Sequence, residues 1–68
     1  MTHNDVARDI ANAYDTSCSG VRYYREDGTP TVNTEEAQYM SRYNPLTNRL
    51  KVMLYPHHDM VGLFYLGN

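Results

Sequence analysis

The chain has little of what usually marks a secreted, membrane or disulfide-bonded protein. Its 68 residues include no tryptophan, one phenylalanine and one cysteine. A single cysteine excludes a disulfide within the chain, and the lack of a signal-like apolar run favours a reducing compartment. The longest unbroken apolar runs, of which Val52 to Tyr55 is one, are far too short to cross a bilayer. We therefore expect a cytoplasmic protein with no membrane partner.

The signatures of catalysis are also missing. The four glycines are isolated from one another, so no glycine-rich phosphate loop is present. No two carboxylates share a setting that would push their pKa values apart. Cys18 has no nucleophile signature and is expected to act as a small buried apolar residue. We expect a protein without catalytic residues, cofactor or metal, and hence not an enzyme.

The charge balance is mild. A net charge of −2 disfavours nucleic acid as a partner, because that partner requires a basic footprint. Residues 1–36 carry seven acids and three arginines, whereas residues 37–68 carry three basic residues and one acid. Chance differences between solvated faces account for this asymmetry, and an acidic face that meets a basic partner is the alternative.

Tyrosine and arginine are the residues that the chain does have. Seven residues are tyrosine, and five of the six basic residues are arginine. Both types are enriched at protein interfaces, where they offer large contact area and directional hydrogen bonds. The composition therefore favours a binding function.

The first half of the chain predicts a helix and then a hairpin. A helix is expected over residues 4–15, capped by Thr2 or Asn4. Its apolar positions fall on one face: Val6, Ala7, Ile10, Ala13 and Tyr14. Strands are expected at residues 21–25 and 29–33, joined through Asp27-Gly28, which is a strong hairpin signal. Pro30 restricts the second strand to an edge, because proline donates no ladder hydrogen bond.

A second helix is predicted over residues 34–43. Asn33 would cap it, and Ala37, Met40 and Tyr43 form a short apolar stripe at helical spacing. Asn44-Pro45 would end it, since the residue before proline is pushed out of the helical region.

The last part predicts a hairpin of residues 49–55 and 60–66 around a four-residue loop. With Tyr55 opposite Met60, one side of this hairpin is uniformly apolar: Leu50, Val52, Leu54, Val61, Leu63 and Tyr65. The fold predicted for residues 1–68 is thus a single small α+β domain of order α-β-β-α-β-β. A three- or four-stranded antiparallel sheet would carry two short helices on one face.

The other side of this hairpin is the candidate binding surface. It is not polar, and two short helices on one face cannot cover it. The predicted contacts are apolar residues with two cations at the rim: Met53, Tyr55, Met60 and Phe64 with Arg49 and Lys51. Second choices lie around the first hairpin turn: Tyr23, Tyr24, Arg25, Glu26 and Asp27. A one-residue change of register would exchange the two sides.

Two other functions compete with protein binding. The segment Arg22 to Arg25 alternates basic and aromatic residues, and could stack the bases of a single-stranded nucleic acid. The cluster His57-His58-Asp59 could bind a metal, but adjacent strand residues point to opposite faces and a metal needs about four ligands. Solvated turn residues are the simpler interpretation of this cluster.

The sequence therefore predicts a small non-enzymatic protein that binds, and thereby inhibits, a larger protein. Acidic domains of this size and tyrosine content are typical of small phage-encoded inhibitors of bacterial defence systems, including anti-CRISPR proteins, or of host enzymes. The expected partner is a bacterial host protein or complex, and a homodimer is a further alternative.

Overall fold

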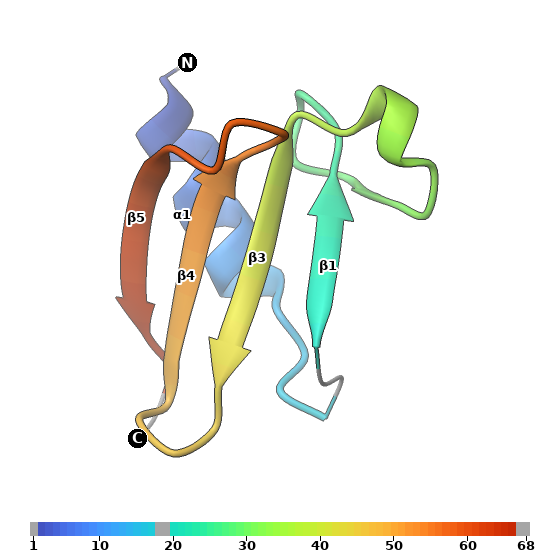
Figure 1. Cartoon of the computed structure of the whole chain (residues 1–68). Coiled ribbons are helices and arrows are strands. Elements are labelled where there is room, and N and C mark those ends of the chain that lie inside the picture. Colours follow the sequence, from blue (N-terminus) through green and yellow to red (C-terminus); the bar gives the residue numbers. More distant parts are fainter. Residues whose placement is uncertain (1, 18–19, 67–68) are drawn as a thin grey trace.

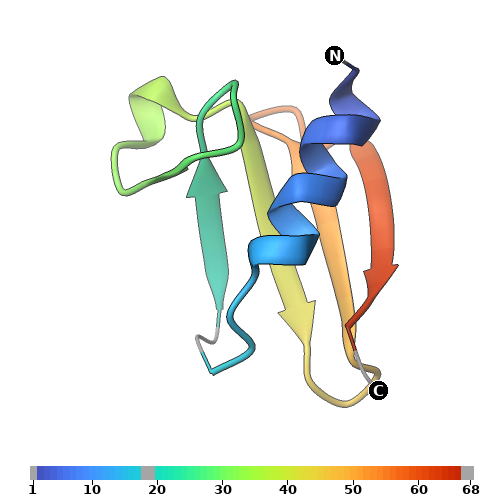
Figure 2. The same ribbon diagram turned by 180° about the vertical axis from the view of Figure 1, so that it is seen from behind.

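The computed structural model describes residues 2–17 and 20–66 and has an α+β fold. Its elements are α1 (His3–Ala13), β1 (Val21–Tyr24), β2 (Pro30–Thr31), the 3-10 helix η1 (Thr34–Glu36), β3 (Tyr39–Asn44), β4 (Arg49–Leu54) and β5 (Met60–Tyr65). All strands pair antiparallel in the order β2-β1-β3-β4-β5. The helix packs on one face of this sheet, and the other face is uncovered (Figures 1 and 2). Within the described ranges, no helix has the length and apolarity needed to cross a membrane.

The predicted N-terminal helix is confirmed as α1. Thr2 is its N-cap, because its Oγ1 accepts from the Asp5 N–H at 3.2 Å while Asp5 Oδ2 accepts from the Thr2 N–H at 3.1 Å. This reciprocal capping box satisfies two donors that a helix start leaves unpaired. The helix ends at Ala13, before the predicted residue 15, since Tyr14 is extended.

The core lies between α1 and the sheet. The helix contributes Val6, Ala7, Ile10 and Ala11, and the sheet contributes Tyr24, Tyr39, Leu50 and Val52, all of them buried. Ser41 is fully buried among them, and its Oγ donates to the Tyr24 hydroxyl at 3.1 Å. Two central strands are therefore joined by one polar contact inside an apolar core.

Removing this contact is expected to lower stability. In Tyr24→Phe, the buried Ser41 hydroxyl loses its partner, which costs about 1–3 kcal/mol when a buried polar group stays unsatisfied. Urea unfolding would measure this loss. The matched control is Tyr23→Phe on the opposite face, and an equal loss in both variants would contradict the role of the hydroxyl pair.

The predicted first hairpin is confirmed as β1 and β2. Arg25 donates its N–H to the Thr29 carbonyl at 2.8 Å, and Gly28 donates to the Arg25 carbonyl at 2.9 Å. Gly28 has φ +90°, a conformation that favours glycine. Pro30 lies in a two-residue strand at the edge of the sheet, as its missing donor requires.

The predicted helix over residues 34–43 is wrong. Only Thr34–Glu36 is helical, as one 3-10 turn, and Tyr39–Asn44 is the central strand β3. Strand pairing decides the conformation, because β3 bonds to β1 on one side and to β4 on the other. Alternate residues Tyr39, Ser41 and Tyr43 then face the helix, a period of two that competes with the helical stripe. Over residues 2–17 and 20–66, the sheet consequently has five strands and the fold has one α-helix.

The predicted strands of the last hairpin are confirmed, but the predicted register is wrong. Met53 pairs with Met60, whereas Val52 pairs with Gly62, so Val61 is an extra residue that forms a β-bulge. Beyond the bulge, Phe64 turns to the helix side, and Leu63 and Tyr65 turn to the uncovered side. Gly62 permits this arrangement, since a Cβ there would lie 2.7 Å from the Phe64 ring.

Candidate protein-binding face of the sheet

The open face is the side of the sheet opposite α1 (Figure 1). The strand pairing places two rows of side chains with different chemistry on it. Cross-strand pairing aligns the apolar row Tyr23, Met40, Met53 and Met60 from β1 to β5. The next row is Val21, Arg42, Lys51 and Leu63. Thus an apolar strip runs beside a strip with two cations at its centre.

The cations of the open face are crowded together. Arg42 lies directly opposite Lys51, and Arg49 is two residues along β4 on the same face. Like charges in directly opposite positions destabilise a sheet. All three residues are exposed and line one shallow groove of about 180 Å³ together with Asn44, Thr47 and Leu63. Among the described residues, Arg25 forms an ion pair with Glu36, whereas Arg42, Arg49 and Lys51 form none.

An aromatic cluster closes the apolar row at one end. The rings of Tyr23 and Tyr55 meet edge to face, with centroids 5.0 Å apart. His58 stands edge-on to Tyr55 at 6.2 Å. Tyr23 and Tyr55 are both half-buried, and their rings contact each other. Tyrosine rings held in this way keep a fixed orientation and lose little conformational entropy when a partner binds.

The structure brings together most of the first-choice contact residues. Tyr55, Met53, Met60, Arg49 and Lys51 lie on the open face, although Met53 is only 9% exposed. Phe64 does not join them, because the bulge turns it toward the core, where it packs against the buried cluster.

The second-choice residues are separated. Tyr23 is on the open face, whereas Tyr24 is buried on the helix side. Glu26 and Asp27 lie in the hairpin turn, where Asp27 Oδ1 accepts from the N–H and the hydroxyl of Thr29. These bonds hold the pKa of Asp27 below its usual value, with the hydroxyl bond as the largest cause. Asp27 therefore builds the turn.

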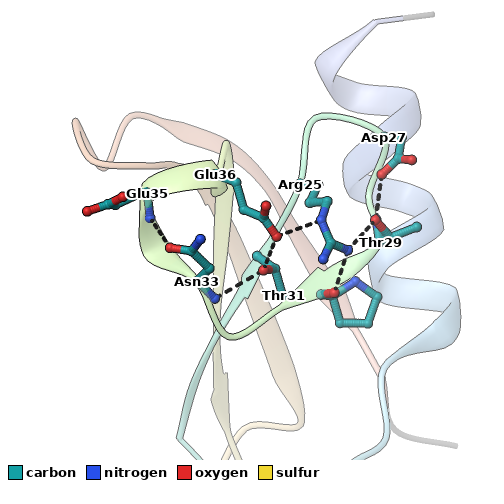
Figure 3. Close-up of polar contacts among 8 residues, drawn as sticks. Arg25, Asp27, Thr29, Thr31, Asn33, Glu35 and Glu36 are labelled. Carbon is teal, nitrogen blue, oxygen red and sulfur yellow. Dashed lines mark hydrogen bonds and ion pairs between the residues drawn. The ribbon is translucent and has the colours of Figure 1, made fainter.

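Arg25 has a structural role in the same region (Figure 3). Its Nε donates to Glu36 Oε1 at 2.8 Å, and its Nη1 donates to Thr29 Oγ1 at 3.1 Å and to the Pro30 carbonyl at 3.0 Å. The Thr31 hydroxyl donates to the same Glu36 oxygen at 2.6 Å. The bond from Thr31 is the largest cause that lowers the pKa of Glu36, and the charge of Arg25 acts in the same direction.

This network predicts a pH effect. A carboxylate with a lowered pKa stabilises the fold above its usual pKa, and this contribution is lost as the pH falls through the lowered value. In Thr31→Val, the pKa of Glu36 is expected to rise toward its usual value, so this carboxylate contributes less stability at neutral pH and less stability is lost as the pH falls. Carboxyl chemical shifts followed by NMR would measure the pKa, and an unchanged Glu36 titration would contradict the assignment.

Besides Val21 and Asn44, four residues of the open face were missed by the sequence prediction: Met40, Arg42, Leu63 and Tyr65. The first two lie in the segment predicted to be helical. The other two were placed on the core side by the register without a bulge. The alternation of Tyr39, Ser41 and Tyr43 with Met40 and Arg42 was the available signal for a strand.

The candidates for metal binding and nucleophilic chemistry are the histidines of the last loop and Cys18, and among them His58 contacts Tyr55 of the open face. His57 and His58 are exposed in the loop, and the described ranges contain no group of three or more His, Cys, Asp or Glu side chains placed to hold a metal. Cys18 lies outside the described residues. A hollow of about 570 Å³ beside α1 contains His3, whose Nδ1 is 2.6 Å from the Tyr39 hydroxyl. Burial raises the pKa of Tyr39, and the charge of Glu26 adds to this effect.

Comparison with known proteins adds no family to this description. No family model matches the chain, and no match was found to a curated protein or to a solved structure. The open face is therefore interpreted from its own chemistry.

Proposed function

We propose that this protein is a non-enzymatic inhibitor that binds a larger protein through the open face of its sheet. The observation that carries the proposal is the side of the sheet opposite α1, where the half-buried Tyr23 and Tyr55 and the exposed Met60 flank the buried Met40 and Met53 and border three exposed cations. Aromatic residues, methionine and arginine are the types enriched in the centre of protein interfaces. A sheet face that only meets water would instead alternate with polar residues.

The cations indicate what kind of surface the partner offers. Arg42 and Lys51 repel each other in the free protein, and the strands of the open face contain no carboxylate to offset them. The acids of the described residues lie elsewhere: on α1, at Asp15 in the segment after α1, in the first hairpin turn, in η1 and in the last loop. A partner surface that supplies carboxylates beside an apolar patch would relieve the repulsion and fit both rows.

Inhibition of the partner is expected from the small size of the protein. A small domain with a single binding face acts on its partner mainly by covering the surface to which it binds. The size, acidity and tyrosine content extend the proposal to a phage-type inhibitor of a bacterial defence system, such as an anti-CRISPR protein, or of a host enzyme. The expected target is then a bacterial host protein or complex.

Affinity capture from a bacterial lysate tests this function. The wild-type chain and the variant Leu46→Ser, which changes an exposed residue of the β3–β4 turn, should retain the same large protein. The double variant Tyr23→Ser/Tyr55→Ser should lose it, because the aromatic end of the open face is removed. Retention by all three proteins would contradict binding through this face, and capture of nothing would contradict the proposed function.

Single-stranded nucleic acid is the second candidate ligand. Tyr23 and Tyr55 share the open face with Arg42 and Lys51, and such a combination can stack bases and contact phosphates. The predicted segment Arg22 to Arg25 is not the binding element, since Tyr24 is buried and Arg25 is bound to Glu36. Salt-sensitive binding of an oligothymidine that is lost in Arg42→Gln would favour this candidate over a protein partner.

A further inference from the structure

One edge of the sheet is open and uncharged. β5 pairs only with β4, and its six residues, Met60 to Tyr65, include no charge and no proline. Both ribbon views show β5 as the outermost strand on its side (Figures 1 and 2). Met60, Leu63 and Tyr65 are 53%, 48% and 64% exposed. Natural sheets usually protect such an edge with charge, proline or a covering segment, because unpaired strands attract another strand.

The backbone of β5 has groups directed away from the sheet. Leu66 donates its N–H to the Asn48 carbonyl at 2.7 Å, toward the β4 side. Backbone groups alternate in direction along a strand, so those of Phe64 also face β4, while those of Leu63 and Tyr65 face outward. These two residues therefore offer two donors and two acceptors at the edge.

The opposite edge of the sheet is protected. β2 has only two residues and begins with Pro30, whose carbonyl accepts from Arg25 Nη1. Thr31 is held by Glu36, and the turn of η1 follows directly in the chain (Figure 3). Proline, a very short strand and the adjoining η1 turn thus protect the edge formed by β2. Among the described residues, the regular part of β5, residues 62–65, has none of these protections.

We infer that β5 is a homodimer interface, in which two copies pair their β5 strands antiparallel about a twofold axis. The bulge at Val61 distorts the start of the strand, so pairing is confined to residues 62–65. With Phe64 at the axis, Leu63 lies opposite Tyr65 of the second copy, and the outward groups of both residues are bonded. In this register the exposed side chains of Leu63 and Tyr65 also contact each other across the two paired strands and bury part of their apolar surface.

Charge distinguishes this arrangement from other ways of joining two copies. A dimer through the open faces would bring Arg42, Arg49 and Lys51 of both copies into one interface, and the strands of that face offer no carboxylate to offset them. Pairing through β5 instead keeps the two β4 strands three spacings apart, roughly 14 Å at about 4.8 Å per strand. This distance exceeds the Debye length of about 8 Å at physiological salt, so the repulsion is screened. The product is a ten-stranded sheet with both open faces on one side.

Sedimentation of the whole chain over a range of concentrations tests the dimer. We expect a reversible rise in mass from 7.9 kDa to twice that value and no further. Leu63→Lys places a charge beside the axis and should abolish the rise. The matched control Val21→Lys changes an exposed apolar residue of the same face on β1 and should dimerise like the wild type.

A second experiment tests the register. In a Cys18→Ser background, a mixture of Leu63→Cys and Tyr65→Cys chains should form the mixed disulfide on mild oxidation far more readily than either variant alone forms its own. A chain that stays monomeric at every concentration, a mass beyond the dimer, or dimers of Leu63→Lys as abundant as those of Val21→Lys would overturn the inference. It does not depend on the proposed partner, so capture of a host protein leaves it unaffected.

Discussion

Leu50→Ala is expected to unfold a large part of the protein population. Leu50 is fully buried, pairs with Tyr43 on β3 and with Phe64 on β5, and belongs to the cluster that contacts α1. Truncation of a buried leucine costs about 2–5 kcal/mol, because transfer energy is lost and a cavity remains. A domain of this length has a total stability of only about 3–10 kcal/mol at roughly 0.05–0.15 kcal/mol per residue. The expected loss is therefore comparable to the whole stability of the domain.

Urea unfolding followed by circular dichroism would measure the change. Leu46→Ala is the matched control, since Leu46 is 95% exposed in the β3–β4 turn and its truncation should alter stability by less than about 0.5 kcal/mol. Equal midpoints for the two variants would contradict the position of Leu50 at the centre of the core.

Elements with local signals were predictable from the sequence. Thr2 and Asp5 satisfy each other's backbone at the start of α1, and Gly28 supplies the positive φ of the first turn. In each case the deciding contact lies within a few residues, so a short stretch of sequence contains it. The positions of both hairpins were predicted for the same reason, although β2 comprises only Pro30–Thr31 and not residues 29–33.

Elements decided by distant contacts were not predictable. Residues 39–44 have tyrosine and methionine at spacings that suit a helix or a strand, and their conformation is set by pairing with both β1 and β4. The bulge at Val61 depends on how Phe64 folds over Gly62 beneath the helix. One inserted residue exchanges the two faces of a strand. Phe64, which was predicted to lie in the candidate site, is therefore on the helix side, and Leu63 and Tyr65 lie on the open face instead.

The candidate face was therefore found in part. The chain's surplus of positive charge after residue 36 was visible in the sequence, as were Arg49 and Lys51 beside apolar residues. The sequence does not assign Arg42 to the face, because it predicts a helix for that segment. Only the pairing of β3 with β4 shows that two cations stand directly opposite each other without a carboxylate on the strands around them.

That pairing makes opposite predictions for stability and binding in Lys51→Glu. The substitution replaces a like-charged cross-strand pair by an oppositely charged one at Arg42, and such pairs contribute about 0.2–1 kcal/mol. The free energy of unfolding should rise by about this amount. Affinity for the captured partner should fall about 10–100-fold, because coupling energies of at least about 1.5 kcal/mol are measured for close charge pairs at an interface.

Urea unfolding and titration calorimetry with the captured partner would measure the two quantities on the same preparation. Lys51→Arg keeps the charge and should change neither by much, and Arg8→Glu reverses an exposed charge on α1 and should leave affinity unchanged. A variant that is less stable and binds weakly would indicate damage to the sheet. A variant that is more stable but binds more weakly would instead show that Lys51 meets negative charge on the partner. In the free protein the repulsion between Arg42 and Lys51 is unfavourable, and negative charge on a partner would offset it. Unchanged affinity in Lys51→Glu would remove the cations from the proposed interface and leave the apolar row alone to carry it.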